Sequence, residues 1–180
     1  SGVSVDGSHD DLIRGNIIAG NSLNGVQVID SENTQLLNNT IGISPFSSDD
    51  VGNVQMGVFI DGSTATVVGG SALYRNTISG NYVYGVYVED SPDTIISYNY
   101  VGTNLDGSAA RGNWASGIYL GGDSDNGLIT GNLVSGNGNH GIYLYGASVD
   151  NAQISGNRVG SNADGSGTIG NAMHGIIIEN

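Results

Sequence analysis

Residues 80–90, GNYVYGVYVED, contain the pattern that decides the fold. Asn81 stands four residues before Gly85, and Gly85 is followed by Val-Tyr-Val, in which apolar residues alternate with one residue of another kind. Such alternation is typical of a short strand with one buried face. The same N-x-x-x-G spacing, each time before an apolar-x-apolar triplet, recurs along the chain. Its asparagines are Asn21, Asn53, Asn81, Asn113, Asn137 and Asn171.

A second element, apolar-x-x-Asn-x-apolar, lies between successive copies of the first. Its leading apolar residues are Ile13, Leu36, Leu73, Ile96, Ile129 and Ile154. Its asparagines are Asn16, Asn39, Asn76, Asn99, Asn132 and Asn157. Together the two elements give each repeat four inward apolar positions and two asparagines, and stacked asparagine amides can hydrogen-bond along a column.

A coil with a constant core path and variable outer loops explains why the repeat length varies. An amphipathic helix does not fit, because glycine recurs too often and no 3.6-residue period appears. We therefore expect an all-β chain, a parallel β-helix (β-solenoid) of six coils in three two-coil repeats, forming one domain over residues 1–180. The long excursions at 42–53, 102–113 and 160–171 should project from one side, one in every second coil.

Segments 67–81 (VVGGSALYRNTISGN), 98–113 (YNYVGTNLDGSAARGN) and 129–144 (ITGNLVSGNGNHGIYL) resemble the parallel β-helix repeats of large bacterial secreted and surface proteins. The resemblance covers essentially the whole chain. It implies the right-handed, pectin-lyase-like form of the β-helix and a secreted or cell-surface location in a bacterium or archaeon. It is specific for fold and names no substrate.

The charge of the chain restricts its partners. There are 17 acidic residues against 4 arginines, no lysine, and a formal net charge of -13. Such a surface repels nucleic acid and anionic membranes and favours cations, basic partners or neutral glycans. Cysteine is absent, so disulfide and thiolate metal sites are excluded. No apolar run is long enough for membrane insertion.

An aromatic column is predicted on the outer face of the triplet strands. The outward residue of four consecutive triplets is aromatic, and two further rings widen the patch. The predicted binding face comprises Phe59, Tyr87, Tyr119, Tyr143, Tyr84 and Trp114. Exposed aromatic patches mark glycan-binding or protein-docking surfaces. The alternative is strand propensity combined with ring stacking that stabilises parallel strands.

Calcium is the candidate ion, although no cofactor is required. Stacked carboxylates after the triplet strands would repel one another, and a divalent cation would relieve that repulsion. Two long loops also share the sequence N-x-D-G-S, which supplies oxygen ligands but equally describes a plain turn. The candidate calcium ligands are Asn104, Asp106, Asn162, Asp164, Asp61 and Glu89.

No catalytic residue is predicted. Glycoside hydrolysis needs two carboxylates facing each other across the sugar, and the pairs at 10–11 and 49–50 lie in different loops. His140 and His174 occupy a variable outward slot one coil apart. The four arginines, Arg14, Arg75, Arg111 and Arg158, form no cluster that spacing reveals.

These observations favour an extracellular structural or adhesive β-solenoid module that self-associates through its coil ends, with assembly into fibres. The chain would then be a segment of a longer protein or a stacking subunit. The alternative is a carbohydrate-active enzyme, or its glycan-binding segment, with a polysaccharide as partner. Fold analogy alone supports that alternative at this point.

Overall fold

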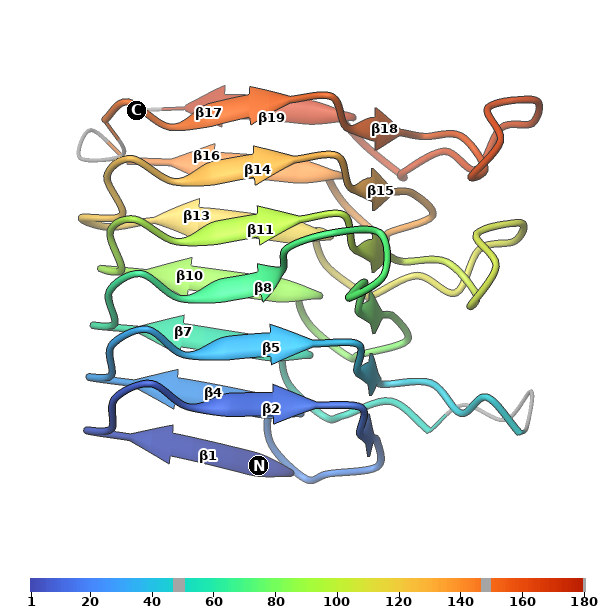
Figure 1. Cartoon of the computed structure of the whole chain (residues 1–180). Coiled ribbons are helices and arrows are strands. Elements are labelled where there is room, and N and C mark those ends of the chain that lie inside the picture. The colour runs from blue at the N-terminus through green and yellow to red at the C-terminus, as the bar shows by residue number, and fades with distance from the viewer. Residues whose placement is uncertain (47–50, 147–149, 180) are drawn as a thin grey trace.

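The computed structural model describes residues 1–46, 51–146 and 150–179. The chain winds through stacked coils, and successive coils place their strands in three parallel sheets (Figure 1). Every strand pairs in parallel with its equivalents in neighbouring coils, so the all-β parallel β-helix predicted from the repeat is confirmed. No helix within the described ranges is long and apolar enough to cross a membrane.

The three sheets are named here by their order along each coil. The first sheet comprises β1 (Val3–Asp6), β4 (Val26–Ile29), β7 (Val58–Asp61), β10 (Val86–Glu89), β13 (Ile118–Gly121), β16 (Ile142–Tyr145) and β19 (Ile176–Glu179). The second comprises β2 (Leu12–Arg14), β5 (Gln35–Leu37), β8 (Val67–Gly69), β11 (Ile95–Ser97), β14 (Leu128–Thr130) and β17 (Gln153–Ser155). The third comprises β3 (Ile17–Ile18), β6 (Thr40–Ile41), β9 (Thr77–Ile78), β12 (Tyr100–Val101), β15 (Leu133–Val134) and β18 (Arg158–Val159).

Each coil points four apolar side chains inward, as the repeat predicts, and the inner coils bury all four. In the second coil these are Val26 and Val28 from the first sheet, Leu36 from the second and Ile41 from the third, all with no exposed surface. Because the register repeats from coil to coil, these positions form continuous apolar columns along the axis. Burial of one such side chain contributes about 1.5–3 kcal/mol.

One predicted core residue is wrong. Leu73 is 85% exposed, and Val68 occupies the core position instead, paired in register with Ile96. The chain leaves β8 at Gly69 and forms an extra loop over residues 70–75 before it reaches Asn76. Because of that loop, Leu73 has the same spacing from Asn76 as the core residues of the other coils have from their asparagines. Leu73 nevertheless lies outside the core of the β-helix.

Both asparagine columns form hydrogen-bonded ladders. In the turn between the third and first sheets, each side-chain amide donates to the side-chain oxygen of the next coil at 2.8–3.0 Å. In the turn between the second and third sheets the corresponding distances are 2.9–3.1 Å. The turn between the first and second sheets has a ladder that the spacing analysis missed. There, each backbone N–H donates to the serine hydroxyl oxygen of the next coil, through Ser31, Ser63, Ser91 and Ser124.

The long loops leave alternate coils on the same side of the molecule, at the right of Figure 1. The loops at 102–113 and 160–171 each contain an antiparallel bridge, Thr103 with Ala110 and Ser161 with Thr168. Residues 47–50 of the loop at 42–53 lie outside the described residues. The two-coil periodicity expected from the loop lengths is therefore present in the fold.

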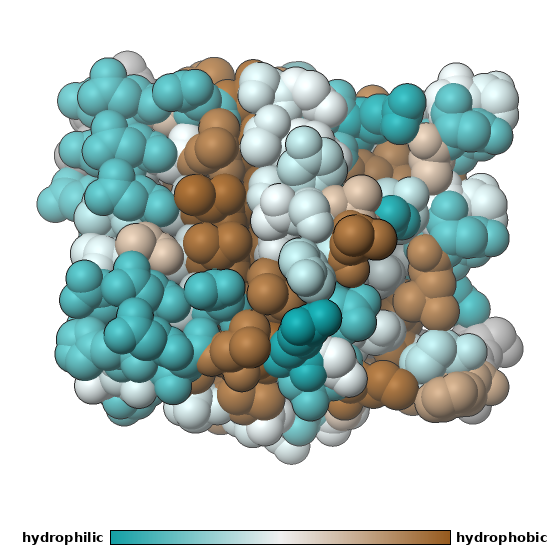
Figure 2. Space-filling view, in the orientation of Figure 1, coloured by the Kyte–Doolittle hydropathy of each residue, from teal (hydrophilic) through white to brown (hydrophobic). Residues whose placement is uncertain are grey.

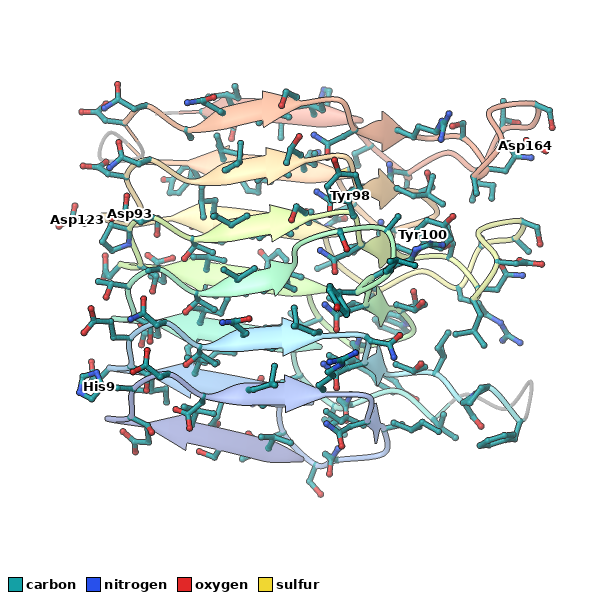
Figure 3. All side chains as sticks on the ribbon, in the orientation of Figure 1. His9, Asp93, Tyr98, Tyr100, Asp123 and Asp164 are labelled. Carbon is teal, nitrogen blue, oxygen red and sulfur yellow. The ribbon has the colours of Figure 1, made fainter. Side chains whose placement is uncertain are left out.

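Charge is segregated between the two turns that flank the second sheet, which form the two edges of that face. Most acidic side chains lie in the turn between the first and second sheets, where Figure 2 shows a hydrophilic margin and Figure 3 labels Asp93 and Asp123. Arg14, Arg75 and Arg158 lie at or beside the opposite turn, between the second and third sheets. Between the two edges, an apolar stripe follows the outer surface of the stacked strands (Figure 2).

Candidate ligand-binding face

The aromatic residues of the first sheet stand in one column. The strand register aligns Phe59 of β7 with Tyr87 of β10, Tyr119 of β13 and Tyr143 of β16. Phe59 and Tyr87 stack with ring centroids 5.7 Å apart, and Tyr87 and Tyr119 stack at 4.5 Å with an interplanar angle of 7°. Tyr119 meets Tyr143 edge-on at 5.5 Å. The rings are therefore in contact without a break over four coils.

Further rings widen this column. Tyr84 lies 5.2 Å from Tyr87 and 5.5 Å from Tyr119. At the other end, His140 lies 5.2 Å from Tyr143 and stacks on His174 at 5.2 Å. The aromatic face, as named from here on, comprises Phe59, Tyr84, Tyr87, Tyr119, Tyr143, Tyr145, His140 and His174.

Trp114 belongs to a neighbouring pair. Its ring contacts Tyr82 at 6.0 Å on the turn that precedes the first sheet, and its side chain is 74% exposed. Conversely, His140 and His174 belong to the aromatic face, although the sequence analysis did not include them because their position in the repeat is variable. The signal was available in the spacing, because Tyr84 occupies the same slot as His140 and His174.

Two carboxylates hold hydroxyl groups of the aromatic face. Tyr87 donates to Glu89 Oε2 and Tyr143 donates to Glu179 Oε2, each at 3.0 Å. Burial, followed by the hydrogen bond to Glu89, raises the pKa of Tyr87. Burial, with the Glu89 charge second, raises the pKa of Tyr119 to about 12. These hydroxyls stay protonated at neutral pH, so they can donate and accept hydrogen bonds but do not act as bases.

Gly121 makes room for the buried ring at the centre of the face. A Cβ atom at Gly121 would collide with the hydroxyl end of Tyr119. The column that contains Gly121 has Glu89 in the preceding coil and Tyr145 in the following one. The single missing side chain therefore lets the Tyr119 ring lie flat against Tyr87.

The two histidines approach each other closely. The Nδ1 atoms of His140 and His174 are 3.3 Å apart, and the backbone N–H of His174 also faces His140 Nδ1 at 3.3 Å. Over the ranges that the structure describes, no group of three or more His, Asp or Glu side chains is arranged to hold a metal ion. The pair alone supplies two nitrogens.

The candidate calcium ligands fall in two separate places. Asp61 and Glu89 are register neighbours at the carboxyl ends of β7 and β10 in the first sheet. Burial raises the pKa of Asp61, with smaller contributions from Asp90 and Asp30. The loop residues lie on the opposite side of the molecule (Asp164 in Figure 3). Calcium binding stays a prediction.

The two N-x-D-G-S loops line one small pocket of about 110 Å³. In each loop the aspartate accepts hydrogen bonds from the serine two residues later: Asp106 Oδ1 from the Ser108 hydroxyl at 2.7 Å, and Asp164 Oδ1 from the Ser166 hydroxyl at 2.7 Å. These bonds lower the pKa of both carboxyl groups. The turn geometry by itself accounts for the shared sequence.

Of the acidic pairs considered for catalysis, the pair at 10–11 lies among the described residues, in the turn between the first and second sheets. Asp10 lies in the acidic turn, where Oδ1 accepts a hydrogen bond from Asn33 at 3.2 Å. Asp49 and Asp50 lie outside the described residues.

Comparison with known families agrees with this architecture. The model of the right-handed β-helix region matches residues 1–180. The chain belongs to this family. No curated protein matches the sequence.

Solved structures of the right-handed β-helix kind include two of the periplasmic alginate epimerase AlgG, one of them a point mutant. Each superposes with a TM-score of 0.54 at 14% identity, over 98% of this chain and 47% of the epimerase chain. At that identity the likeness shows the fold alone. The chain spans about half the length of these structures.

Proposed function

We propose that the chain is a carbohydrate-binding β-helix module whose aromatic face holds a neutral polysaccharide along the axis of the coils. The observation that carries the proposal is the unbroken series of ring contacts from Phe59 to His174. Phe59, Tyr87 and Tyr119 stack face to face, so they offer a ligand an apolar surface of ring edges with polar tips. Successive coils repeat that surface about every 4.8 Å, so a polymer parallel to the axis meets the same chemistry at each step.

The charges around the aromatic face favour an uncharged ligand. Asp61, Glu89 and Glu179 border the rings. An anionic polymer on this face would be repelled by them, whereas a neutral sugar can donate hydroxyl hydrogen bonds to the same carboxylates.

The epimerase structures support the carbohydrate-active alternative of the sequence analysis better than the structural or adhesive role. They also support a location outside the cytoplasm, because the neighbour is periplasmic. Self-association through the coil ends and assembly into fibres stay predictions.

Calorimetric titration with neutral oligosaccharides of increasing length tests the proposal. Affinity should rise with length until the ligand spans the four coils of the column. Tyr87→Ala and Tyr143→Ala should each weaken binding at least about tenfold. Tyr74→Ala is the matched control, because Tyr74 is 38% exposed and stacks beneath Arg14, away from the aromatic face.

Equal affinities for all three variants, or no binding of any neutral oligosaccharide, would show that the rings only stabilise the stacked strands. Analysis of the same mixtures for shortened or altered sugars shows whether the module also acts on what it binds.

A further inference from the structure

A groove of about 390 Å³ lies on another side of the molecule, at the turn between the second and third sheets. Figure 3 shows Tyr98 and Tyr100 here, beside the extra loop that follows β8. The groove runs along the axis from the third coil to the sixth. Its lining residues are Ala72, Arg75, Tyr98, Tyr100, Gly131, Gly156 and Arg158.

In the part of the chain that the structure describes, the two arginines of the groove form no ion pair with a carboxylate. The Arg75 guanidinium lies 4.0 Å above the Tyr100 ring and makes one long hydrogen bond, 3.4 Å, to the Ala72 carbonyl. Across the described ranges, neither Arg75 nor Arg158 has a carboxylate oxygen within 4.0 Å, although the chain carries 17 acidic residues. Arg158 contributes to the lowered pKa of Asp164, but less than the Ser166 hydrogen bonds do. The groove is therefore a positive region on a strongly negative protein.

Tyr98 holds a backbone conformation that a bulky residue rarely adopts. Its φ is +60°, and the equivalent positions of other coils hold Gly15, Asn38, Gly131 and Gly156. A tyrosine in the left-handed region is strained, and such strain concentrates at functional sites. The Tyr98 ring lies over Gly131, where a Cβ atom would be only 3.0 Å from the ring. The glycines of the next two coils thus leave the floor of the groove open.

The spacing of the positive groups suits a chain of acidic sugars. Arg75 covers Tyr100, and Arg158 lies two coils beyond Tyr100 in the same column, with Leu133 between them. Two coil steps correspond to about 10 Å, which is more than one sugar ring. Arginine binds carboxylates through paired N–H groups, and tyrosine rings provide the apolar surface for the sugar.

We propose that this groove binds an acidic oligosaccharide, with uronate carboxylates at Arg75 and Arg158 and sugar rings against Tyr98 and Tyr100. The site is independent of the proposed neutral-glycan site, because it involves other residues on a different sheet. A variant that loses the binding of acidic sugars can therefore still be tested for the binding of neutral sugars, and the reverse.

The test uses the intact chain and three probes: an oligogalacturonide, the same oligosaccharide after methyl esterification, and polyglutamate of equal charge. Calorimetry measures affinity at low and high salt for wild type, Arg75→Gln, Arg158→Gln and Arg111→Gln. Arg111→Gln removes the same charge at the end of a long loop, outside the groove. Thermal unfolding of each variant checks that it is folded.

The proposal predicts that the oligogalacturonide binds, that salt weakens binding, and that the ester does not bind. Arg75→Gln and Arg158→Gln should each weaken binding at least about tenfold, and Arg111→Gln less than about twofold. Equal losses of affinity in all three variants would show that binding depends only on net charge and would contradict the proposed site. Polyglutamate binding as tight as the sugar would overturn the role of the tyrosines. Weakening by Tyr87→Ala would move the acidic ligand to the aromatic face.

Discussion

The side-chain amide of Asn76 donates a hydrogen bond of 2.9 Å to the side-chain oxygen of Asn99 in the next coil, and both residues are fully buried. The same amide donates to the Leu36 carbonyl at 2.8 Å, and the Asn76 backbone N–H also reaches Asn99 Oδ1 at 3.1 Å. In turn, Asn76 Oδ1 accepts from Asn39. Asn76 therefore hydrogen-bonds to the coil before its own and to the coil after it.

Removing one central ladder residue should be costly. Asn76→Ala removes the side-chain partner of the buried Asn39 backbone N–H and of the Leu36 carbonyl, and one of the hydrogen bonds to Asn99 Oδ1, so we expect a loss of about 3 kcal/mol in the free energy of unfolding. Asn16→Ala, at an exposed position of the same ladder, should cost about 1 kcal/mol or less. Urea denaturation compares the two. Equal losses would mean that the ladder adds nothing beyond a local turn preference.

Ala65 offers a stabilising substitution. It has φ +54° at a turn position where the other coils hold Asp10, Asn33, Asp93 and Asn126, residues that tolerate this conformation better. Ala65→Gly should raise the free energy of unfolding by about 1 kcal/mol. The reciprocal change, Asn126→Ala, should lower it, because it also removes the hydrogen bond from Asn126 to Asp93 Oδ1. Thermal unfolding midpoints that move the same way in both variants would contradict this account.

Tyr98 should show opposite effects on stability and binding. Tyr98→Asn relieves a left-handed backbone conformation that Asn38 adopts in another coil, so we expect about 1 kcal/mol of added stability. The same change removes the ring from the groove and should weaken the binding of acidic oligosaccharides. Urea denaturation and calorimetry on one preparation measure both quantities. A less stable variant would show that the ring contact outweighs the backbone strain.

Alkaline pH should destabilise the protein through the tyrosines of the aromatic face. An unfolded tyrosine loses its proton near pH 10, whereas burial raises the pKa of Tyr119 to about 12 in the folded chain. Between these values the unfolded state binds fewer protons, so the free energy of unfolding falls as pH rises from 10 toward 12. Tyr119→Phe should flatten that decline. The measurement is urea denaturation at a series of pH values, and an unchanged slope in the variant would place the titrating group elsewhere.

Most of the fold could be predicted from the sequence because a solenoid repeats its constraints in every coil. The N-x-x-x-G spacing of Asn81 and Gly85 recurs six times, with an apolar-x-x-Asn-x-apolar element between its copies. Together the two elements are enough to locate strands, most inward residues and both asparagine ladders. The prediction of Leu73 as a core residue was wrong because spacing from Asn76 cannot distinguish a core residue from one in an inserted loop. The serine ladder was missed because serine occurs at many other places in this chain.

The sites could be predicted less completely. The aromatic column follows from strand alternation, since Tyr87 and Tyr119 share a position in the repeat. The groove does not, because Arg75 comes from the inserted loop and Arg158 from a strand two coils beyond Tyr100. The equivalent positions Gly15, Asn38, Gly131 and Gly156 are a sequence signal for the left-handed conformation of Tyr98, but only the backbone shows that Tyr98 adopts it.

The acidic turn and the arginines lie on opposite sides of the second sheet, so the charge of the molecule is unevenly distributed across its width. With most carboxylates along one margin and three arginines along the other, the protein carries an electric dipole perpendicular to the axis of the coils. In a field, or beside a charged wall, such a molecule turns about that axis until one margin faces the charge. The aromatic face then has a defined orientation relative to the wall before any sugar is bound.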